Sequence, residues 1–559
     1  MTEVAAVERP FDYLVTDATS QVGVGDRVRV DFNHRSVRGW VIGEAPVSAE
    51  LKPLVKWLGY GPPPSLLELL AWAGVRWYGP LSRLLLASSP KRLVTQLPSV
   101  PVASALASSV LLDAPQYAPG VIEVSPTTDP LSLILAAYEM TRERSGSLLV
   151  LVPTEAWATR LRGRLEQRGC AVASGDGEWD RVRAGWPVVV GARSTALAPV
   201  PQVCGAVVLD ADDEAYRSQA SPTWEVTSML RERCARDNAP LWCTSTMPSA
   251  SLVNDEPVQQ WSDAAGWPRI EVVDRRGSDP HEGVLGAAAL GAAHRALRGD
   301  DAVAVCVVLQ RLGTGRLFAC HRCGEVARCA TCHQAEVDHD GQMACADLHE
   351  LRANFCRQCG VTNLKPVRVG VTTLARDVAN QLGQVVSEVT ASSDADARLA
   401  RVVVGTEAIW QRVRRCGVVI FVDFDQYLLA PRASARHRAV AAVGKAGRLV
   451  GSRREGRGAV VLQTRRGEDP VLASLVRGDV HDLVVEDVQT ARLLSLPPYG
   501  AMAEVSGHGA DAFVAALPAT VRVSSGPSPF IVRAPDVSTL TSALASTTRP
   551  AGRLRVAVT

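Results

Sequence analysis

After about residue 121, apolar residues recur in short continuous runs that alternate with segments of helical spacing. Continuous apolar strands separated by helices are typical of a parallel, doubly wound sheet buried on both faces. The predicted strands form two series, one before and one around a cysteine-rich window: 148–152, 188–191, 206–210 and 241–243, then 303–309, 367–372, 402–405, 418–423 and 460–463. The pattern therefore predicts two doubly wound α/β lobes in tandem.

The first hundred residues have a different pattern. Alternating segments at 27–31 and 39–42 predict strands, and a Leu- and Trp-rich stretch at 65–87 predicts a helix. We therefore expect a multidomain α/β protein that begins with a small β-barrel-like domain. Its predicted parts are that domain (1–105), a Ser/Ala/Pro linker (106–120), lobe 1 (121–275), lobe 2 (276–318 and 361–485), a zinc module (319–360) and a small α+β C-terminal domain (486–559).

The length and net charge of the chain limit which classes of protein it can belong to. A chain of 559 residues is long enough for three or four domains, each with its own core. It shows no charged-then-apolar leader and no apolar run of about eighteen residues, so we expect a cytoplasmic protein without membrane contact. The net charge is only +2, so any nucleic-acid contact must come from local patches.

Seven of the thirteen cysteines lie between positions 320 and 359, spaced C-x2-C-x5-C-x2-C-x12-C-x10-C-x2-C. Two C-x-x-C pairs can supply the four thiolates of a tetrahedral zinc site, and a reducing compartment favours this over disulfides. The last pair but one is incomplete: Cys345 has Leu348 where a second cysteine would fall, and His349 follows. The alternative, cysteines buried as small hydrophobes, is disfavoured because the other six are scattered singly.

Tandem α/β lobes favour a nucleoside-triphosphate motor, which needs a G-x-x-x-x-G-K-[ST] phosphate loop. Only Lys445 follows a glycine, and Ala446 comes next, so the chain contains no such loop. After the first strand of lobe 1, Pro130 stands at the lysine position and Leu131 at the position of the magnesium-binding hydroxyl. Asp129 beside them would repel a phosphate.

Segments of the front domain resemble the PriA family of primosomal replication-restart proteins, which are DNA-binding members of a helicase superfamily. They are Phe11-Asp12-Tyr13, Gly25-Asp26-Arg27-Val28-Arg29-Val30-Asp31-Phe32, Gly39-Trp40-Val41 and Glu50-Leu51-Lys52-Pro53-Leu54-Val55. The resemblance implies a pocket for the 3′ end of a DNA strand at Phe11, Asp12, Tyr13, Asn33 and Lys52. Asn33 replaces a family glycine, but asparagine can adopt similar backbone angles. Phe11 and Tyr13 have a second interpretation, as core aromatics of a small barrel.

The resemblance implies that the two lobes are RecA-like, and they carry altered versions of the family's helicase motifs. Asp210 corresponds to the magnesium-binding aspartate, Ala211 replaces the catalytic glutamate, and Arg448 corresponds to the γ-phosphate sensor. The other matching segments are Gly191-Ala192-Arg193-Ser194, Ser245-Thr246-Met247-Pro248-Ser249 and Gly405-Thr406-Glu407. The resemblance therefore implies a degenerate actinobacterial form, without catalytic residues and without the family's winged-helix domain; the excess of arginine over lysine fits a high-GC genome of that kind.

In the family, two zinc ions are bound in an interleaved way. The resemblance assigns Cys320, Cys323, Cys356 and Cys359 to one Zn²⁺, and Cys329, Cys332 and Cys345 with an eighth ligand to the other. His349 is the first choice for the eighth ligand, followed by His339 and Asp347; the alternative for each histidine is a solvent-facing loop residue.

Three functions remain open. The first is a replication-restart protein that binds branched DNA with a 3′ end at stalled or abandoned forks and recruits primosome or helicase-loading proteins, with single-strand-binding protein as a further partner. The second is an active ATP-dependent 3′–5′ DNA helicase with a bound nucleotide. The third is an unrelated zinc-ribbon module. The altered motifs favour the first.

Overall fold

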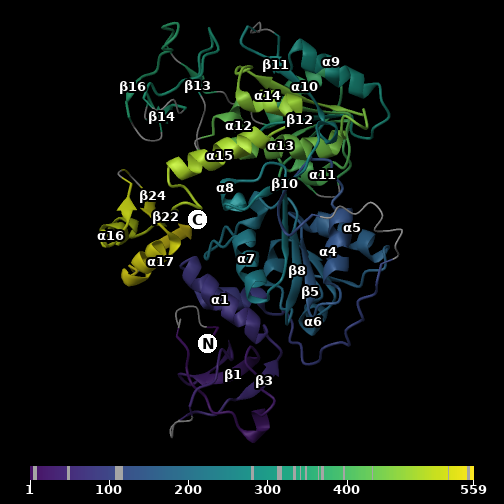
Figure 1. Cartoon of the computed structure of the whole chain (residues 1–559). Helices are drawn as coiled ribbons and strands as arrows, with labels where there is room; N and C mark the ends of the chain where they lie inside the picture. Colours follow the sequence, from purple (N-terminus) through teal and green to yellow (C-terminus); the bar gives the residue numbers. More distant parts are fainter. Residues whose placement is uncertain are drawn as a thin grey trace. The chain divides into compact units, whose positions relative to one another are not determined.

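The computed structural model describes residues 1–3, 9–46, 51–106, 117–277, 282–310, 318–331, 335–339, 341–345, 349–362, 364–366, 371–394, 397–430, 432–524, 526, 528–550 and 554–559. The chain divides into two compact units (Figure 1). The first comprises Met1–Glu123, Asp129–Gln260 and Glu486–Thr559, and the second Val124–Thr128 and Trp261–Val485.

Unit 1 begins with an antiparallel sheet of order β2-β1-β3, formed by β1 (Arg27–Phe32), β2 (Arg35–Trp40) and β3 (Lys56–Gly59). The strand predicted at 27–31 is confirmed. The second strand begins at Arg35 and not at residue 39, because Asn33 and His34 adopt positive φ angles of 50° and 60° and reverse the chain directly.

The single helix predicted at 65–87 is two helices, α1 (Pro64–Arg76) and α2 (Leu81–Ser88). Pro80 lies between them; it lacks an N–H group and disfavours helical backbone in the residue before it. The predicted linker is partly packed: Trp242 Nε1 donates to Tyr117 O at 3.0 Å, and Leu106 is buried. Residues 107–116 lie outside the described part of the chain.

Lobe 1 contains a seven-stranded sheet of order β10-β4-β9-β8-β5-β7-β6 in its described residues. Its central pairings are parallel, and α4 and α7 both pack on β8, on opposite sides of it in Figure 1. The doubly wound sheet predicted from the apolar runs is confirmed. The elements are β4 (Gly120–Val124), α4 (Leu131–Thr141), β5 (Ser147–Leu151), α5 (Glu155–Glu166), β6 (Val172–Ser174), α6 (Trp179–Ala184), β7 (Val188–Gly191), β8 (Val203–Val208), α7 (Val226–Arg236), β9 (Leu241–Ser245), α8 (Ala250–Val253) and β10 (Val258–Trp261).

In its described residues, the C-terminal segment of unit 1 forms a sheet of order β23-β24-β22-β25 that is accompanied by helices. Its core is continuous with the core under α1 and α2 and with the core of lobe 1. One apolar core therefore spans these parts of unit 1. The elements are α15 (His481–Leu493), which starts in unit 2, β22 (Ala501–Gly507), α16 (Ala510–Ala515), β23 (Arg522–Val523), β24 (Phe530–Ala534), α17 (Val537–Ser546) and β25 (Leu554–Val558).

Unit 2 contains a parallel sheet of order β11-β21-β20-β12-β19-β18 among its described residues, as expected for a second lobe. The strand predicted at 367–372 is wrong at its end, since α10 begins at Val371; residues 367–370 lie outside the described part. The elements are β11 (Arg269–Asp274), α9 (Ala287–Leu297), β12 (Val305–Val308), α10 (Val371–Leu382), β18 (Val386–Val389), β19 (Val402–Gly405), α11 (Ile409–Arg412), β20 (Val418–Phe421), α12 (Asp425–Leu428), α13 (Ala435–Val450), β21 (Ala459–Thr464) and α14 (Pro470–Arg477).

The described residues of the cysteine-rich insertion include two small antiparallel sheets. One joins β13 (Phe318–Ala319) to β17 (Lys365–Pro366), and the other joins β14 (Val337–His339), β15 (Gln342–Ala344) and β16 (Arg352–Ala353). Short 3-10 helices elsewhere cover Asp17–Thr19, Arg193–Leu197, Glu214–Tyr216 and Ala264–Gly266.

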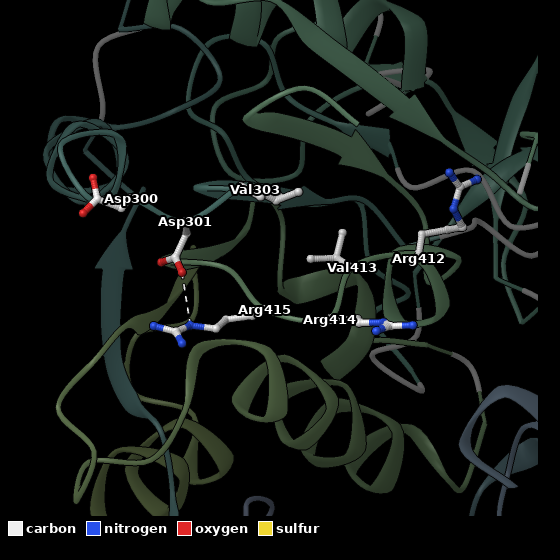
Figure 2. A pocket seen from close by; sticks show the side chains of 8 residues that line it. Asp300, Asp301, Val303, Arg412, Val413, Arg414 and Arg415 are labelled. Atoms are coloured by element: carbon white, nitrogen blue, oxygen red, sulfur yellow. Dashed lines mark ion pairs between the residues drawn. The ribbon is translucent and has the colours of Figure 1, made fainter. Parts of the chain in front are cut away.

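A hollow in lobe 2 lies beside the amino ends of β12 and β20, the sheet edge opposite the carboxyl ends at which ligands bind in such sheets. Figure 2 shows Arg412, Arg414 and Arg415 directed away from one another. Arg415 Nε pairs with Asp301 at 3.1 Å, and Arg412 donates to Ala397 O at 2.8 Å. These arginines do not converge on a common ligand position.

Candidate metal centre and nucleic-acid interface

The ligand atoms of Cys320, Cys323, Cys356 and Cys359 all lie within 4.8 Å of one another. The Sγ atoms of Cys320 and Cys359 are 3.4 Å apart, and those of Cys323 and Cys356 are 3.5 Å apart. Four sulfurs at about 2.3 Å from a tetrahedral zinc lie about 3.8 Å from each other. The cluster therefore has the spacing that such an ion requires.

Two equivalent turns build this cluster. Gly324 N donates to Cys320 O and Gly360 N to Cys356 O, each at 2.9 Å. Both glycines have positive φ, 76° and 73°, which a residue with a side chain rarely adopts. This conformation explains why glycine follows each of the two C-x-x-C pairs of this cluster.

Neighbouring thiols disfavour ionisation of Cys323 and favour ionisation of Cys320. Burial and the neighbouring thiols raise the pKa of Cys323 to about 12. Burial also opposes ionisation of Cys320, but N–H groups of Cys323 and Arg322 lower its pKa to about 6. A cation between the four sulfurs would favour the thiolate form of all four cysteines, since metal binding displaces thiol protons.

A second cluster brings together Cys329, Cys345 and His349, again within 4.8 Å. His349 Nδ1 lies 3.3 Å from Cys345 Sγ and 3.9 Å from Cys329 Sγ. His339 lies on β14 and is exposed, outside this group. Cys332 and Asp347 lie outside the described residues. Both clusters can hold a metal ion.

A buried ion pair links the two clusters, and the sequence pattern did not indicate it. Arg352 Nε lies 3.0 and 2.9 Å from the two carboxylate oxygens of Glu336, with side chains 5% and 1% exposed. Arg352 also donates to Phe355 O beside Cys356, and Glu336 N donates to Ala327 O at 2.9 Å. The pair thus ties together the segments that carry both cysteine groups.

In the front domain, residues 11–14 run beside the segment that carries Lys52. Leu14 N donates to Lys52 O and Leu54 N to Leu14 O, each at 2.9 Å. Asp12 and Lys52 are both exposed, and Lys52 Nζ lies 3.5 Å from Asp31 Oδ2. The structure therefore brings the predicted pocket segments together.

The two aromatic residues of the predicted pocket differ in their surroundings. Tyr13 packs against the apolar core of the small sheet, and its hydroxyl donates to Asp31 O at 3.0 Å. Phe11 is half-buried, with its ring centroid 4.9 Å from that of Phe32 and the Arg9 guanidinium 5.0 Å above it. The core interpretation thus fits Tyr13 better than Phe11. Asn33 is exposed in its left-handed conformation.

At the place of the missing phosphate loop, a carboxylate caps helix α4. Asp129 Oδ1 accepts from Leu131 N at 3.1 Å and pairs with Arg164 Nη1 at 3.0 Å. Burial alone would raise the pKa of this carboxyl, but the hydrogen bonds from Arg164 and Leu131 hold it below its ordinary value. Asp129 therefore places a negative charge at the helix N-terminus, where a phosphate would bind.

Other residues in or beside the helicase motifs form hydrogen bonds within the protein. Ala211 is buried, and its N–H donates to Thr244 O at 2.7 Å. Asp212 Oδ2 accepts from Ser245 Oγ at 2.8 Å and from Ser249 N at 3.0 Å. In unit 2, Arg448 Nε donates to Pro126 O at 3.0 Å.

Two parallel α/β lobes with a cysteine-rich insertion define a two-lobed α/β protein with a candidate metal module. Residues 2–90 match the PriA family described as 3'DNA-binding domain (3'BD). A probable replication restart protein PriA from Mycobacterium tuberculosis (strain H37Rv) is 26% identical over 576 residues, 91% of this chain and 86% of the relative. The resemblance to PriA indicated by the motifs is confirmed.

A second relative, replication restart protein PriA from Thermotoga maritima, is 23% identical over 404 residues. This match covers 65% of the chain but 53% of the relative, so the chain spans about half of that protein's length. A DEAD box protein structure from Methanococcus jannaschii covers 68% of the chain at 11% identity with a TM-score of 0.30, too low to bear on function. Among the described residues, no helix has the length and apolar character to cross a membrane.

Proposed function

We propose that this protein binds branched DNA at stalled or abandoned replication forks and recruits primosome or helicase-loading proteins without hydrolysing ATP. The observation that carries the proposal is the match of residues 2–90 to the 3′ DNA-binding domain of PriA. The exposed Asp12 beside the segment of Lys52 supports it, because a carboxylate can accept a hydrogen bond from a terminal 3′-hydroxyl.

The nucleotide motifs support a role without ATP hydrolysis. Phosphoryl transfer depends on positioned charges, and Pro130 and Ala211 supply none of the charge that lysine and glutamate would. The Asp129 carboxylate, paired with Arg164, opposes a phosphate at the same helix end. Residual nucleotide binding is therefore not part of the proposed function.

The DNA pocket predicts a preference for forks with a leading-strand 3′ end at the junction. Stacking of one base on an aromatic ring such as Phe11 contributes roughly 1–3 kcal/mol, so we expect the preference to be about fivefold or more. Asp12→Ala should remove the preference and leave salt-dependent general binding. Affinities for both forks, measured by fluorescence anisotropy at fixed salt, check this.

A matched control is Asp17→Ala, which removes another exposed carboxylate of the same domain. It should keep the preference. Equal binding of both forks by the unmodified protein would refute the pocket and assign Phe11, with Tyr13, to the domain core.

For the metal module we propose two zinc ions per chain, with His349 as the eighth ligand beside Cys329, Cys332 and Cys345. Elemental analysis should find about two zinc ions in the purified protein and about one after His349→Ala. His339→Ala, a control in the same module, should leave two. A count of two after His349→Ala would exclude His349 as a ligand.

A further inference from the structure

Three basic side chains lie side by side across the front sheet. In the β1–β2 register Arg29 is directly opposite Arg38, and in the β1–β3 register it is directly opposite Lys56. Side chains of directly opposed residues point to the same face of an antiparallel sheet. Arg38, Arg29 and Lys56 therefore form a cationic row across β2, β1 and β3.

Repulsion among the three cations of this row disfavours folding, and a bound anionic ligand would offset it. Like charges directly opposite each other destabilise an antiparallel pair. Arg38 and Lys56 are exposed and Arg29 is half-buried, and none of the three has an acidic partner among the described residues. The repulsion thus has no compensating ion pair in the described part of the protein.

Nearby charged groups on the same face are already paired. Arg27, two residues from Arg29, is buried and pairs with Glu3. Asp31, two residues from Arg29 on the other side, lies 3.5 Å from Lys52 Nζ. The acidic groups next to the row are therefore directed at other cations, and the row keeps its positive charge.

We propose that the cationic row binds the phosphates of the DNA strand whose 3′ end enters the pocket at Phe11, Asp12 and Lys52. This inference rests on the proposed function and extends it from the strand end to the strand backbone. The charge of the row complements a polyanion. Its position fits as well, since Arg29 and Asp31 lie on one face of β1, two residues apart, and Asp31 contacts Lys52.

The dimensions of the row suit a nucleic-acid backbone. Neighbouring strands are about 4.8 Å apart, so the outer backbones of the row are separated by about 10 Å. Each strand of a DNA duplex carries one phosphate per about 3.4 Å of axis. The row can therefore reach two or three successive phosphates of one strand.

The test combines DNA affinity, its salt dependence and protein stability. In the double variant Arg38→Gln/Lys56→Gln, we expect fork affinity at low salt to fall about tenfold and the slope of log K against log salt to become shallower by about 1.8, or about 0.9 per phosphate. Its melting temperature should be unchanged or higher, because the repulsion is relieved. A face with only a structural role would instead lower the melting temperature and leave the slope unchanged, which would overturn the proposal.

The control for a single lost charge is Arg83→Gln, at an exposed arginine on α2, which should leave the salt slope unchanged. The single variant Arg38→Gln should make the salt slope shallower. The 3′-end preference, measured as the ratio of the two fork affinities, should persist in the row variants. The affinity ratio in Asp12→Ala tests the pocket separately. The proposal for the row and the proposal for the pocket can therefore be refuted independently. If a poly-glutamate peptide binds through the row while the DNA slope is unaltered in the variants, the face belongs to an acidic protein and the proposal is wrong.

Discussion

The purified protein is expected to hydrolyse no ATP in the presence of forked DNA. A phosphate loop without lysine cannot neutralise the transferred phosphoryl group, and Ala211 cannot orient or activate water. Losing one such group typically slows catalysis by about 10²- to 10⁵-fold, so two losses place turnover far below the roughly 1–10³ s⁻¹ typical of enzymes. The Asp129 carboxylate at the start of α4 adds repulsion of the nucleotide itself.

A coupled ATPase assay, with and without DNA, measures this directly. The control is Asp210→Ala, which removes the residue at the magnesium-binding position. Turnover that persists in this variant comes from a contaminant. Sustained DNA-stimulated turnover of about 1 s⁻¹ or faster that Asp210→Ala abolishes would restore the helicase interpretation.

The second large effect is expected at the buried pair in the cysteine module. Arg352→Met leaves the Glu336 carboxylate, 1% exposed, without its main partner. Leaving one charge of a buried pair unpaired destabilises by about 3–5 kcal/mol. Because the pair joins the segments of both clusters, we expect a chelator to extract zinc from the zinc-loaded module roughly 10²- to 5 × 10³-fold faster.

Two variants control for this effect. Arg357 lies at the rim of the same pair, 36% exposed, so Arg357→Met should change the release rate little. Glu336→Met/Arg352→Leu removes both charges and should restore near-normal retention, because an apolar replacement of a buried pair is often neutral. Metal release from Arg352→Met at the rate of the unmodified protein would contradict the role of the pair.

The lobes were predictable because each of their strands is encoded locally, as a continuous apolar run. The strands at 188–191 and 402–405 match β7 and β19 at both ends. The prediction of a single helix over 65–87 was wrong, also for a local reason. Pro80 interrupts the helix, although the apolar periodicity continues across it. The sequence pattern therefore predicts the presence of a helix or strand better than the positions at which it is interrupted.

The charge pairs were not predictable in the same way. Asp129 and Arg164 are 35 residues apart, and Glu336 and Arg352 are 16 apart. Which arginine meets which carboxylate depends on how α4 and α5, or β14 and β16, are placed. No spacing rule along the chain contains that information.

By itself, the sequence determined which chemistry is available: two C-x-x-C-Gly turns for a metal, and the lack of a phosphate-loop lysine. These features depend on a few consecutive residues, whose backbone angles and side-chain types act locally. Only the tertiary structure decided that His349, and not the alternative His339, lies with Cys329 and Cys345, and that Arg29, Arg38 and Lys56 share one sheet face. Those results depend on register and packing between separate segments, because a shift of one residue would turn each side chain to the other face.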